Sequence, residues 1–423
     1  MKETKKLTLA KSLELFEEAQ TLIPGGVLGA RKPTDFIKGE YPIFLEKGKG
    51  CRLFDVDGNE YIDFLCGYGP IILGYQEEEV DNAVVDQIKN NGFCLDLTQP
   101  FQNALAKKII ELVPSAEMCA FLKTGSDATT ASIRIARAYT NRVKVMRCGY
   151  HGWHEWCVEM KGGIPEKLYE DVYEFHYNDL DQLEDLMKKH GDETAAIIMT
   201  PFGHPLHQKM QEPKPGFLEG VRALADKYGA VLIYDEVRTC FRLSLGGAQG
   251  LYGVNPDLTV LGKGMANGYA ISVVAGKKEL MMTAATELFI SSTFFPNSLP
   301  YIAALKTIEI IQRDKVLDDI WAKGKGFLEK IQKVLDRYPE TGAELSGIPP
   351  MFFITFTQDE KRTRRYRRND FFTQLIRKGH FFAPHHHAYI CYRHTQEDLD
   401  KTVQAIDESL AYVKDRYVSG EYA

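Results

Sequence analysis

The fold is decided by Val231-Leu232-Ile233-Tyr234-Asp235-Glu236-Val237, a stretch in which apolar residues lead directly into a pair of carboxylates. A continuous apolar run of this length is typical of a strand buried on both faces of a parallel sheet. A second short apolar stretch, 259–261, ends at Gly262-Lys263-Gly264. Ligands of parallel sheets bind outside the carboxyl ends of the strands, so Asp235 and Lys263 are both predicted to face a ligand site.

The chain around this stretch alternates short apolar segments with amphipathic ones. Such alternation predicts an α/β fold, in which a mainly parallel central sheet is covered by helices on both faces. The predicted strands are 118–122, 143–147, 195–200, 231–234, 259–261 and 271–275, and the predicted helices between them are 127–139, 180–190 and 218–228.

Both ends of the chain differ from this central pattern. Residues 42–64 predict a small antiparallel meander that turns at Asp57-Gly58-Asn59. After a helical pattern at 298–313, the remaining sequence predicts a smaller α+β unit with a strand at 351–356. We therefore expect an amino-terminal segment (1–75) that packs with the small domain, a large cofactor-binding domain (76–312) and a small carboxy-terminal domain (313–423).

An aspartate and a lysine at the ends of strands are the minimum equipment for holding pyridoxal phosphate. The carboxylate of Asp235 keeps the pyridine nitrogen protonated, so that the ring can accept electrons, and Lys263 carries the cofactor as a Schiff base. Either residue alone is usually a solvated surface charge. The prediction therefore depends on the two residues together.

The phosphate of such a cofactor needs its own binding site, and Thr124-Gly125-Ser126-Asp127 has the features of one. Gly125 allows the backbone to approach a ligand, while Ser126 and the N–H groups of the following helix favour an anion. The same residues also fit an ordinary helix start with a serine or aspartate cap. Tyr150, after the next predicted strand, fits either a ring stacked on a flat cofactor or a core aromatic.

An ordered set of motifs resembles the class III pyridoxal-phosphate aminotransferases, and in particular the branch that contains glutamate semialdehyde aminomutase. The resemblance extends from about residue 20 to about residue 410. The motifs are Thr124-Gly125-Ser126-Asp127-Ala128, Tyr150-His151-Gly152, Asp235-Glu236-Val237-Arg238-Thr239, Gly246-Gly247-Ala248-Gln249, Pro256-Asp257, Leu261-Gly262-Lys263 and Ser291-Ser292-Thr293-Phe294, with Ile23-Pro24-Gly25-Gly26-Val27, Tyr68-Gly69-Pro70 and Arg393-His394-Thr395 matching the branch.

This resemblance implies a fold-type I enzyme that is a homodimer with a shared active site. Lys263 and Asp235 keep the roles described above, and Lys263 also moves the substrate proton. Of the remaining cofactor contacts, Tyr150 and Val237 would lie on opposite faces of the ring, Gly125 and Ser126 would bind phosphate, and Thr293 of the partner subunit would join them.

The chain departs from the family pattern at several positions. Thr200-Pro201 stands where the family has Glu-Pro, and His204 is the residue expected to take over by reaching the ring oxygen of the cofactor. Arg31 lies close to the arginine that holds the substrate carboxylate in the aminomutase branch, but one residue nearer to the preceding motif. His386 replaces a glutamate of that branch, and Tyr68 is predicted to form a wall of the substrate pocket.

These departures favour an aminotransferase that moves an amino group from an amino-acid donor, glutamate or alanine by family habit, to a carbonyl acceptor by a ping-pong mechanism. The alternative within the family is a 2,1-aminomutase of the glutamate semialdehyde type. A binding protein without turnover is a third possibility, and the retention of Lys263 and Asp235 argues against it.

Composition excludes several other classes of protein. A net charge of −6 gives no overall nucleic-acid footprint, so the basic run 361–368 predicts a solvated helix face or a contact with a phosphate-bearing or acidic substrate. Three adjacent histidines, 385–387, would alternate in direction on a strand and so predict no metal site. The eight cysteines contain no Cys-x-x-Cys pair, and no apolar run is long enough to span a membrane, so a cytoplasmic location is expected.

Overall fold

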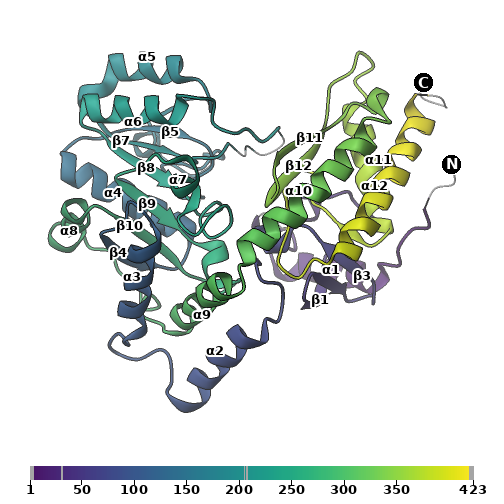
Figure 1. Ribbon diagram of the computed structural model, residues 1–423, viewed down its shortest axis with the longest axis horizontal. Helices are drawn as coiled ribbons and strands as arrows, with labels where there is room; N and C mark the ends of the chain where they lie inside the picture. The colour runs from purple at the N-terminus through teal and green to yellow at the C-terminus, as the bar shows by residue number, and fades with distance from the viewer. Residues whose placement is uncertain (1–3, 30–31, 204, 206–207, 419–423) are drawn as a thin grey trace. The chain divides into compact units, whose positions relative to one another are not determined.

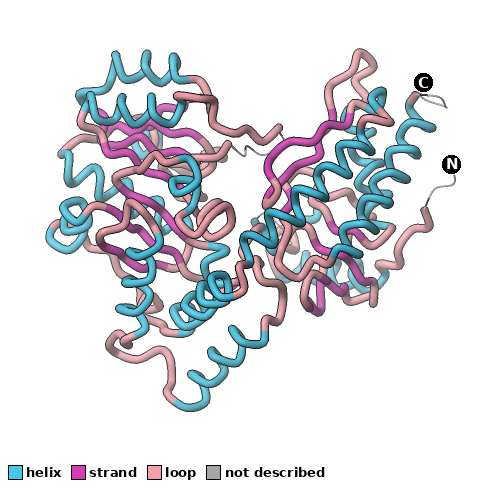
Figure 2. The backbone as a smooth tube through the Cα atoms, in the orientation of Figure 1, coloured by secondary structure: helices cyan, strands magenta, loops and turns pink. Residues whose placement is uncertain are grey.

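The structure is a computed structural model that describes residues 4–29, 32–203, 205 and 208–418. It divides into two compact units. Unit 1 contains the two ends of the chain, Met1–Glu77 and Asp318–Ala423, together with Leu206–Met210. Unit 2 contains Glu78–Pro205 and Gln211–Leu317. Each unit combines strands with helices, as the colours of Figure 2 show.

Unit 2 is built on a sheet that has seven strands within the described residues, in the order β4-β10-β9-β8-β7-β5-β6. The pairs β9-β8, β8-β7, β7-β5 and β5-β6 are parallel, whereas β10 is antiparallel to both of its neighbours. The strands are β4 (Met118–Leu122), β5 (Lys144–Cys148), β6 (Val172–Glu174), β7 (Thr194–Met199), β8 (Val231–Asp235), β9 (Leu258–Leu261) and β10 (Ser272–Gly276).

Alternate residues of the central strands point into two separate hydrophobic cores. Ile198 and Ile233 face the core that α4 covers, while Ile197 and Leu232 face the core that α5 and α6 cover. Figure 1 shows α5 and α6 together at one edge of unit 2. Burial on both faces explains why these strands are apolar without interruption. The helices of unit 2 are α2 (Glu78–Asn90), α3 (Phe101–Leu112), α4 (Gly125–Thr140), α5 (Leu180–His190), α6 (Phe217–Tyr228), α7 (Gly247–Tyr252), α8 (Lys278–Thr286) and α9 (Leu299–Arg313).

The predicted α/β architecture with a mainly parallel sheet is confirmed, and the predicted strands match the observed ones to within one or two residues. Two features of the sheet were not predicted. β6 is a short edge strand, which has too few residues to give a pattern. β10 runs antiparallel because the connection 262–271 is too short for the crossover that a parallel neighbour of β9 would require.

Unit 1 brings together strands from both ends of the chain. β3 pairs in parallel with β13, with Ile62 opposite His380, and β12 pairs with β11 and β14. Its core contains Phe64, whose ring stacks on Phe327 and Phe382 at centroid distances of 5.6 and 4.5 Å. The strands are β1 (Leu45–Lys49), β2 (Arg52–Asp55), β3 (Glu60–Asp63), β11 (Ala343–Ile348), β12 (Met351–Phe356), β13 (His380–Phe381) and β14 (Ala388–Tyr389), and the helices are α1 (Ala10–Leu22), α10 (Val316–Leu335), α11 (Arg364–Arg377) and α12 (Gln396–Tyr417).

In the part of the chain that the structure describes, no helix combines the length and the apolar character that crossing a bilayer requires.

Candidate active site

Asp235 is the last residue of β8 and is buried, with 6% of its surface exposed. Its Oδ2 lies 2.9 Å from Nδ1 of His151, and its Oδ1 accepts a hydrogen bond from the backbone N–H of Val237 at 3.2 Å. A buried carboxylate is costly unless it is paired and hydrogen-bonded. The histidine and the backbone donor therefore hold this anion in a fixed orientation at the carboxyl end of the sheet.

His151 is a site residue whose role was not predicted from the sequence. It is 2% exposed, its ring stacks against Trp156 at 6.1 Å, and its backbone carbonyl accepts a hydrogen bond from Thr129 Oγ1 at 2.6 Å. A histidine directly after the predicted aromatic Tyr150, at the end of a strand, was the available signal. Its pairing with a residue of another strand depends on the order of strands in the sheet.

Lys263 follows β9, the strand next to β8, where Asp235 is paired with Val260. The lysine has a φ of +43° and opens a short 3-10 turn, η6 (Lys263–Ala266), that packs against α9. Positive φ is uncommon for a residue with a side chain and costs of order 1–3 kcal/mol. Strain of this kind persists where the surrounding structure imposes it, which is frequent at functional sites.

The beginning of α4 has the chemistry of an anion site. A capping box uses two of its backbone donors, because Thr124 Oγ1 accepts from the N–H of Asp127 while Asp127 accepts from the N–H of Thr124. Helix starts leave their first N–H groups without intrahelical acceptors. No described residue accepts from the N–H groups of Gly125 and Ser126, so these donors and the helix dipole are available to a phosphate.

Close contacts bring the start of α4 together with the loop after β5 and the turn after β8. Gly152 has a φ of +117°, and a Cβ atom there would lie 2.3 Å from Oγ of Ser126. A Cβ atom at Gly125 would lie 3.4 Å from both γ carbons of Val237, and one at Gly262 would lie 3.6 Å from Cγ1 of the same valine. Gly125, Ser126 and Val237, three of the predicted cofactor residues, are therefore clustered at one end of the sheet.

This cluster fits pyridoxal phosphate by its donors and its shape. It offers a buried carboxylate for a protonated ring nitrogen, backbone N–H groups for a phosphate, and an apolar valine between glycines against which a flat ring could pack. Tyr150 follows β5 by two residues and is 50% exposed, with the Arg238 guanidinium 5.7 Å from the centre of its ring. Its role as a stacking partner remains a prediction.

Glu236, the second carboxylate of the stretch 231–237, has a structural role. It is fully buried, accepts hydrogen bonds from the N–H groups of Ala248 and Gln249 at 2.8 and 3.0 Å, and also bonds the Thr239 hydroxyl. Burial raises the pKa of Glu236, and these donors oppose the increase. Gly247 has a φ of +76° and lies against the same carboxylate, which explains the glycine pair in the Gly-Gly-Ala-Gln motif.

The structure describes two of three further positions that the sequence analysis singled out, Thr200 and Thr293, and does not describe the third, His204. Thr200 is buried after β7, and its hydroxyl lies against the backbone of Gly149. Thr293 lies in an exposed turn between α8 and α9, and its predicted contribution across a dimer remains a prediction. His204, expected to replace the family glutamate, lies outside the described residues.

In unit 1, two predicted substrate residues lie together. The rings of Tyr68 and His386 meet edge to face at a centroid distance of 5.2 Å. Arg31, the third predicted substrate residue, lies outside the described residues. The histidines 385–387 form a turn and not a strand, so the expected alternation in direction is wrong, and the rings of His386 and His387 stack at 4.0 Å. The described residues contain no group of three or more histidine, cysteine or acidic side chains arranged to hold a metal ion.

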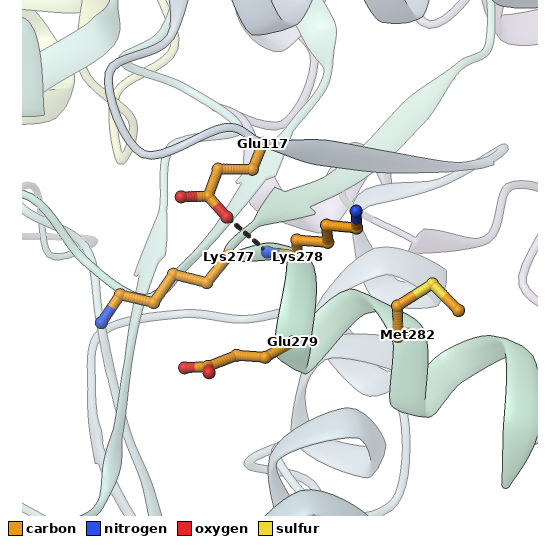
Figure 3. Close-up of a pocket in the computed structure, with 5 residues that line it drawn as sticks. All are labelled: Glu117, Lys277, Lys278, Glu279 and Met282. Atoms are coloured by element: carbon orange, nitrogen blue, oxygen red, sulfur yellow. Dashed lines mark hydrogen bonds between the residues drawn. The ribbon is translucent and has the colours of Figure 1, made fainter.

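A surface hollow of about 480 Å³ lies elsewhere on unit 2, at the start of α8. Figure 3 shows that Glu117 accepts a hydrogen bond from the N–H of Lys278, at 2.7 Å, while the Lys277 side chain extends away from it. Lys277 instead pairs with Asp257 at 2.6 Å. Glu117 thus accepts a hydrogen bond at the start of α8, and Lys277 pairs with the aspartate just before β9. None of the described residues that were predicted to bind the cofactor lines this hollow.

Comparisons with known proteins identify the family that this chain resembles along most of its length. The family model described as aminotransferase class-III matches residues 36–410. A 3-aminobutyryl-CoA aminotransferase from Cloacimonas acidaminovorans is 58% identical, over 97% of this chain and 99% of its own. A glutamate-1-semialdehyde 2,1-aminomutase from Persephonella marina is 33% identical, over 95% and 99%. The structure of the FumI protein from Sphingopyxis sp. MTA144, in its PLP internal aldimine form, is 30% identical with a TM-score of 0.90, over 97% and 98%.

Proposed function

The chain belongs to the class III aminotransferases, which depend on pyridoxal phosphate, and from this premise we propose that it transfers the amino group of a 3-aminoacyl-CoA thioester, 3-aminobutyryl-CoA, to a 2-oxo acid. The observation that carries the proposal is the 58% identity to the 3-aminobutyryl-CoA aminotransferase along nearly the whole of both chains. The aminomutase relative is much less similar, at 33%.

Two predicted pocket residues of unit 1 fit the uncharged acyl end of a thioester. In a thioester the carboxyl group is masked and carries no charge. Its recognition needs hydrogen-bonding and apolar contacts in place of a bidentate arginine. The edge-to-face pair of Tyr68 and His386 offers a wall of this kind, at the position where the aminomutase branch has a glutamate.

When bound, pyridoxal phosphate supplies an aldehyde carbon that can join an amine and a ring that accepts the electron pair left on the substrate carbon. Lys263 Nζ would hold that aldehyde carbon in the resting enzyme. With a substrate amine bound, the same Nζ would take the proton from C3 of the substrate. Lys263 has a left-handed backbone just after β9, at the same end of the sheet as Asp235.

Asp235 stabilises the charge that the reaction needs. Its carboxylate, held by His151 and by the N–H of Val237, would keep the ring nitrogen protonated. The N–H groups of Gly125 and Ser126 would hold the phosphate from the start of α4. Both contacts are made by groups that are already in place, so little reorganisation is needed when charge develops.

The overall exchange is balanced without an oxidant. The C3–N bond of 3-aminobutyryl-CoA is broken, and the amino nitrogen with its two hydrogens, together with the hydrogen of C3, passes to a 2-oxo acid, which becomes an amino acid. The oxo acid loses its oxygen as water, and water supplies the carbonyl oxygen at C3 of 3-oxobutyryl-CoA. We propose 2-oxoglutarate or pyruvate as the acceptor, so that glutamate or alanine is the product and serves as the donor in the reverse direction. We also propose a homodimer in which Thr293 of the partner subunit completes the phosphate site.

The experiment that tests this function mixes the purified holoenzyme with single amines and follows the yellow absorption of the bound cofactor. We expect 3-aminobutyryl-CoA, glutamate and alanine to discharge the colour, and free 3-aminobutyrate to react at least ~100-fold less efficiently. Light scattering on the same sample measures the proposed dimer. A protein that keeps its colour with the thioester, but loses it with free 3-aminobutyrate, would refute the thioester assignment.

The aminomutase is the second candidate, because relatives with that name match along the full chain. A mutase would isomerise glutamate semialdehyde with no oxo-acid partner, whereas a transaminase requires one. Measuring product from glutamate semialdehyde with and without 2-oxoglutarate separates the two. We expect no isomerisation in either mixture.

A further inference from the structure

The first turns of α11 carry a cluster of arginines that the proposed chemistry does not use. Arg364 and Arg368 are four residues apart on one helix face, and Arg365 is three residues from Arg368. Side chains with these spacings are neighbours, and like charges there repel. The first turn contains no acidic residue, although the amino end of a helix favours negative charge. The first turn of the helix therefore supplies no negative charge of its own to this cluster.

Arg367, in the middle of this cluster, shows what a structural arginine looks like. It is 3% exposed, and its guanidinium donates to the carbonyls of Thr341 and Thr357 and lies 3.5 Å from Asp359. Arg365 and Arg368 differ from it, because among the described residues no carboxylate lies within ion-pair distance of either. Arg368 donates to the neutral side-chain oxygen of Asn369 at 3.1 and 3.3 Å, so its positive charge is hydrogen-bonded but not balanced by a described carboxylate.

Arg368 connects the cluster to the predicted substrate residues. Its guanidinium lies 3.0 Å from Nδ1 of His385, which accepts because arginine can only donate. His385 directly precedes His386, whose ring meets Tyr68 at 5.2 Å. Burial, followed by repulsion from Arg364 and Arg365, lowers the pKa of Arg368 to about 10. A cationic patch and an aromatic pocket wall therefore adjoin each other within unit 1.

Coenzyme A combines the two chemistries that this arrangement would recognise. Its acyl thioester end is uncharged, and a long pantetheine arm separates that end from a diphosphate and a 3′-phosphate. We propose that Arg365 and Arg368, assisted by Arg364, bind the phosphates of the coenzyme A portion of the substrate, while Tyr68 and His386 contact its acyl end. This inference rests on the proposed function and adds to it the residues that distinguish a coenzyme A thioester from a free amino acid.

The test compares two thioesters on the holoenzyme. One is 3-aminobutyryl-CoA, and the other is the N-acetylcysteamine thioester of 3-aminobutyrate, which lacks every phosphate. In the Arg365→Gln/Arg368→Gln variant we expect KM for the coenzyme A thioester to rise at least ~10-fold, because contacts between charged groups and phosphate would be lost. We expect KM for the truncated thioester to change less than two-fold, which also shows that the variant is folded.

A matched control and a conservative variant sharpen this result. Arg337→Gln removes an exposed arginine of unit 1 that pairs with Asp407, and it should leave both KM values unchanged. Arg368→Lys keeps the charge and should lose less than Arg368→Gln. Added salt should raise the wild-type KM for the coenzyme A thioester only, because screening weakens phosphate contacts. Equal KM changes on both thioesters, or no change on either, would overturn the inference.

Failure of the proposed function can be recognised separately. If the wild type turns over neither thioester, titration with adenosine 3′,5′-bisphosphate still compares it with the double variant. Binding that weakens at least ~10-fold in the variant would support the phosphate site without the reaction. Equal binding to both proteins would overturn the site. Inorganic phosphate that competes as well as the bisphosphate would assign the cluster to a free anion and also overturn it.

Discussion

The two units hold their functional side chains in different ways. In unit 2, Asp235 is the last residue of β8 and Lys263 lies two residues after the end of the neighbouring strand β9, so the hydrogen bonds of the sheet fix the positions of their backbones. In unit 1, Tyr68 and His386 come from turns near opposite ends of the chain, and Tyr68 itself has a φ of +70°. The cofactor chemistry is therefore built on rigid strands, whereas the predicted recognition of substrate depends on turns that can vary without disturbing a sheet.

This difference predicts that substitutions in unit 2 reduce kcat, whereas substitutions in the turns of unit 1 raise KM. The largest effect is expected for Lys263→Ala, because the amine that holds the cofactor and moves the proton is removed. Transamination should fall by at least ~10⁴-fold, and the cofactor should be lost more readily on dialysis. Turnover and retained absorbance measure both. Lys278→Ala, an exposed lysine of the same unit, is the control, and near-normal turnover in Lys263→Ala would refute the assignment.

Asp235→Asn should have the next largest effect, since the carboxylate is neutralised while its shape is kept. We expect kcat to fall ~10²–10³-fold, the range typical of removing one preorganised electrostatic contact. Asp226→Asn, on the exposed face of α6, removes only an exposed ion pair with Arg222 and should have little effect. If the two substitutions reduced kcat equally, the buried carboxylate of Asp235 would have no special role, which would contradict the prediction.

Stability in unit 1 should depend on His380, whose ring bonds Thr402 in the core. Burial, followed by repulsion from Lys378 and Arg52, lowers the pKa of His380 from its ordinary value of 6.5 to about 4. A depressed folded-state pKa contributes stability that is present above pH 6.5 and is lost as the pH falls towards 4. The shift corresponds to about 3 kcal/mol.

Urea unfolding between pH 7 and pH 4 measures this contribution. His380→Asn should remove much of the acid sensitivity of unit 1, whereas His176→Asn, an exposed histidine of unit 2, should leave it unchanged. Acid sensitivity that is the same in wild type and His380→Asn would show that other groups cause it.

The smallest effect is expected for His386→Ala, which removes one ring of the aromatic pair with Tyr68. KM for the thioester should rise roughly 2–10-fold with kcat nearly constant, because an aromatic pair is worth ~0.5–1.5 kcal/mol. His190→Ala, which removes a ring stacked on Tyr173 in unit 2, is the matched control. A fall in kcat larger than the rise in KM would show that His386 takes part in the chemical step. That result would contradict the expected difference between unit 1 and unit 2.

The sequence alone predicted the parts of this protein that follow from local patterns. Buried strands show as apolar runs, so the α/β sheet, the place of Asp235 at the end of β8 and that of Lys263 after β9 could be predicted residue by residue. The glycine turn before α4 was also evident, because a capping sequence is local. The order of the motifs was sufficient to indicate the family.

Only the tertiary structure decided which of these residues meet. His151 pairs with Asp235 because β5, β7 and β8 lie side by side, and nothing in the spacing of the two residues encodes that order. Glu236 accepts hydrogen bonds from the N–H groups of Ala248 and Gln249 in α7. This structural role could not be seen in the stretch 231–237 itself, because both partners lie later in the chain. Tyr68 and His386 become neighbours when strands from both ends of the chain pair in unit 1. Long-range pairing depends on the whole set of buried contacts, and no single stretch of sequence contains that information.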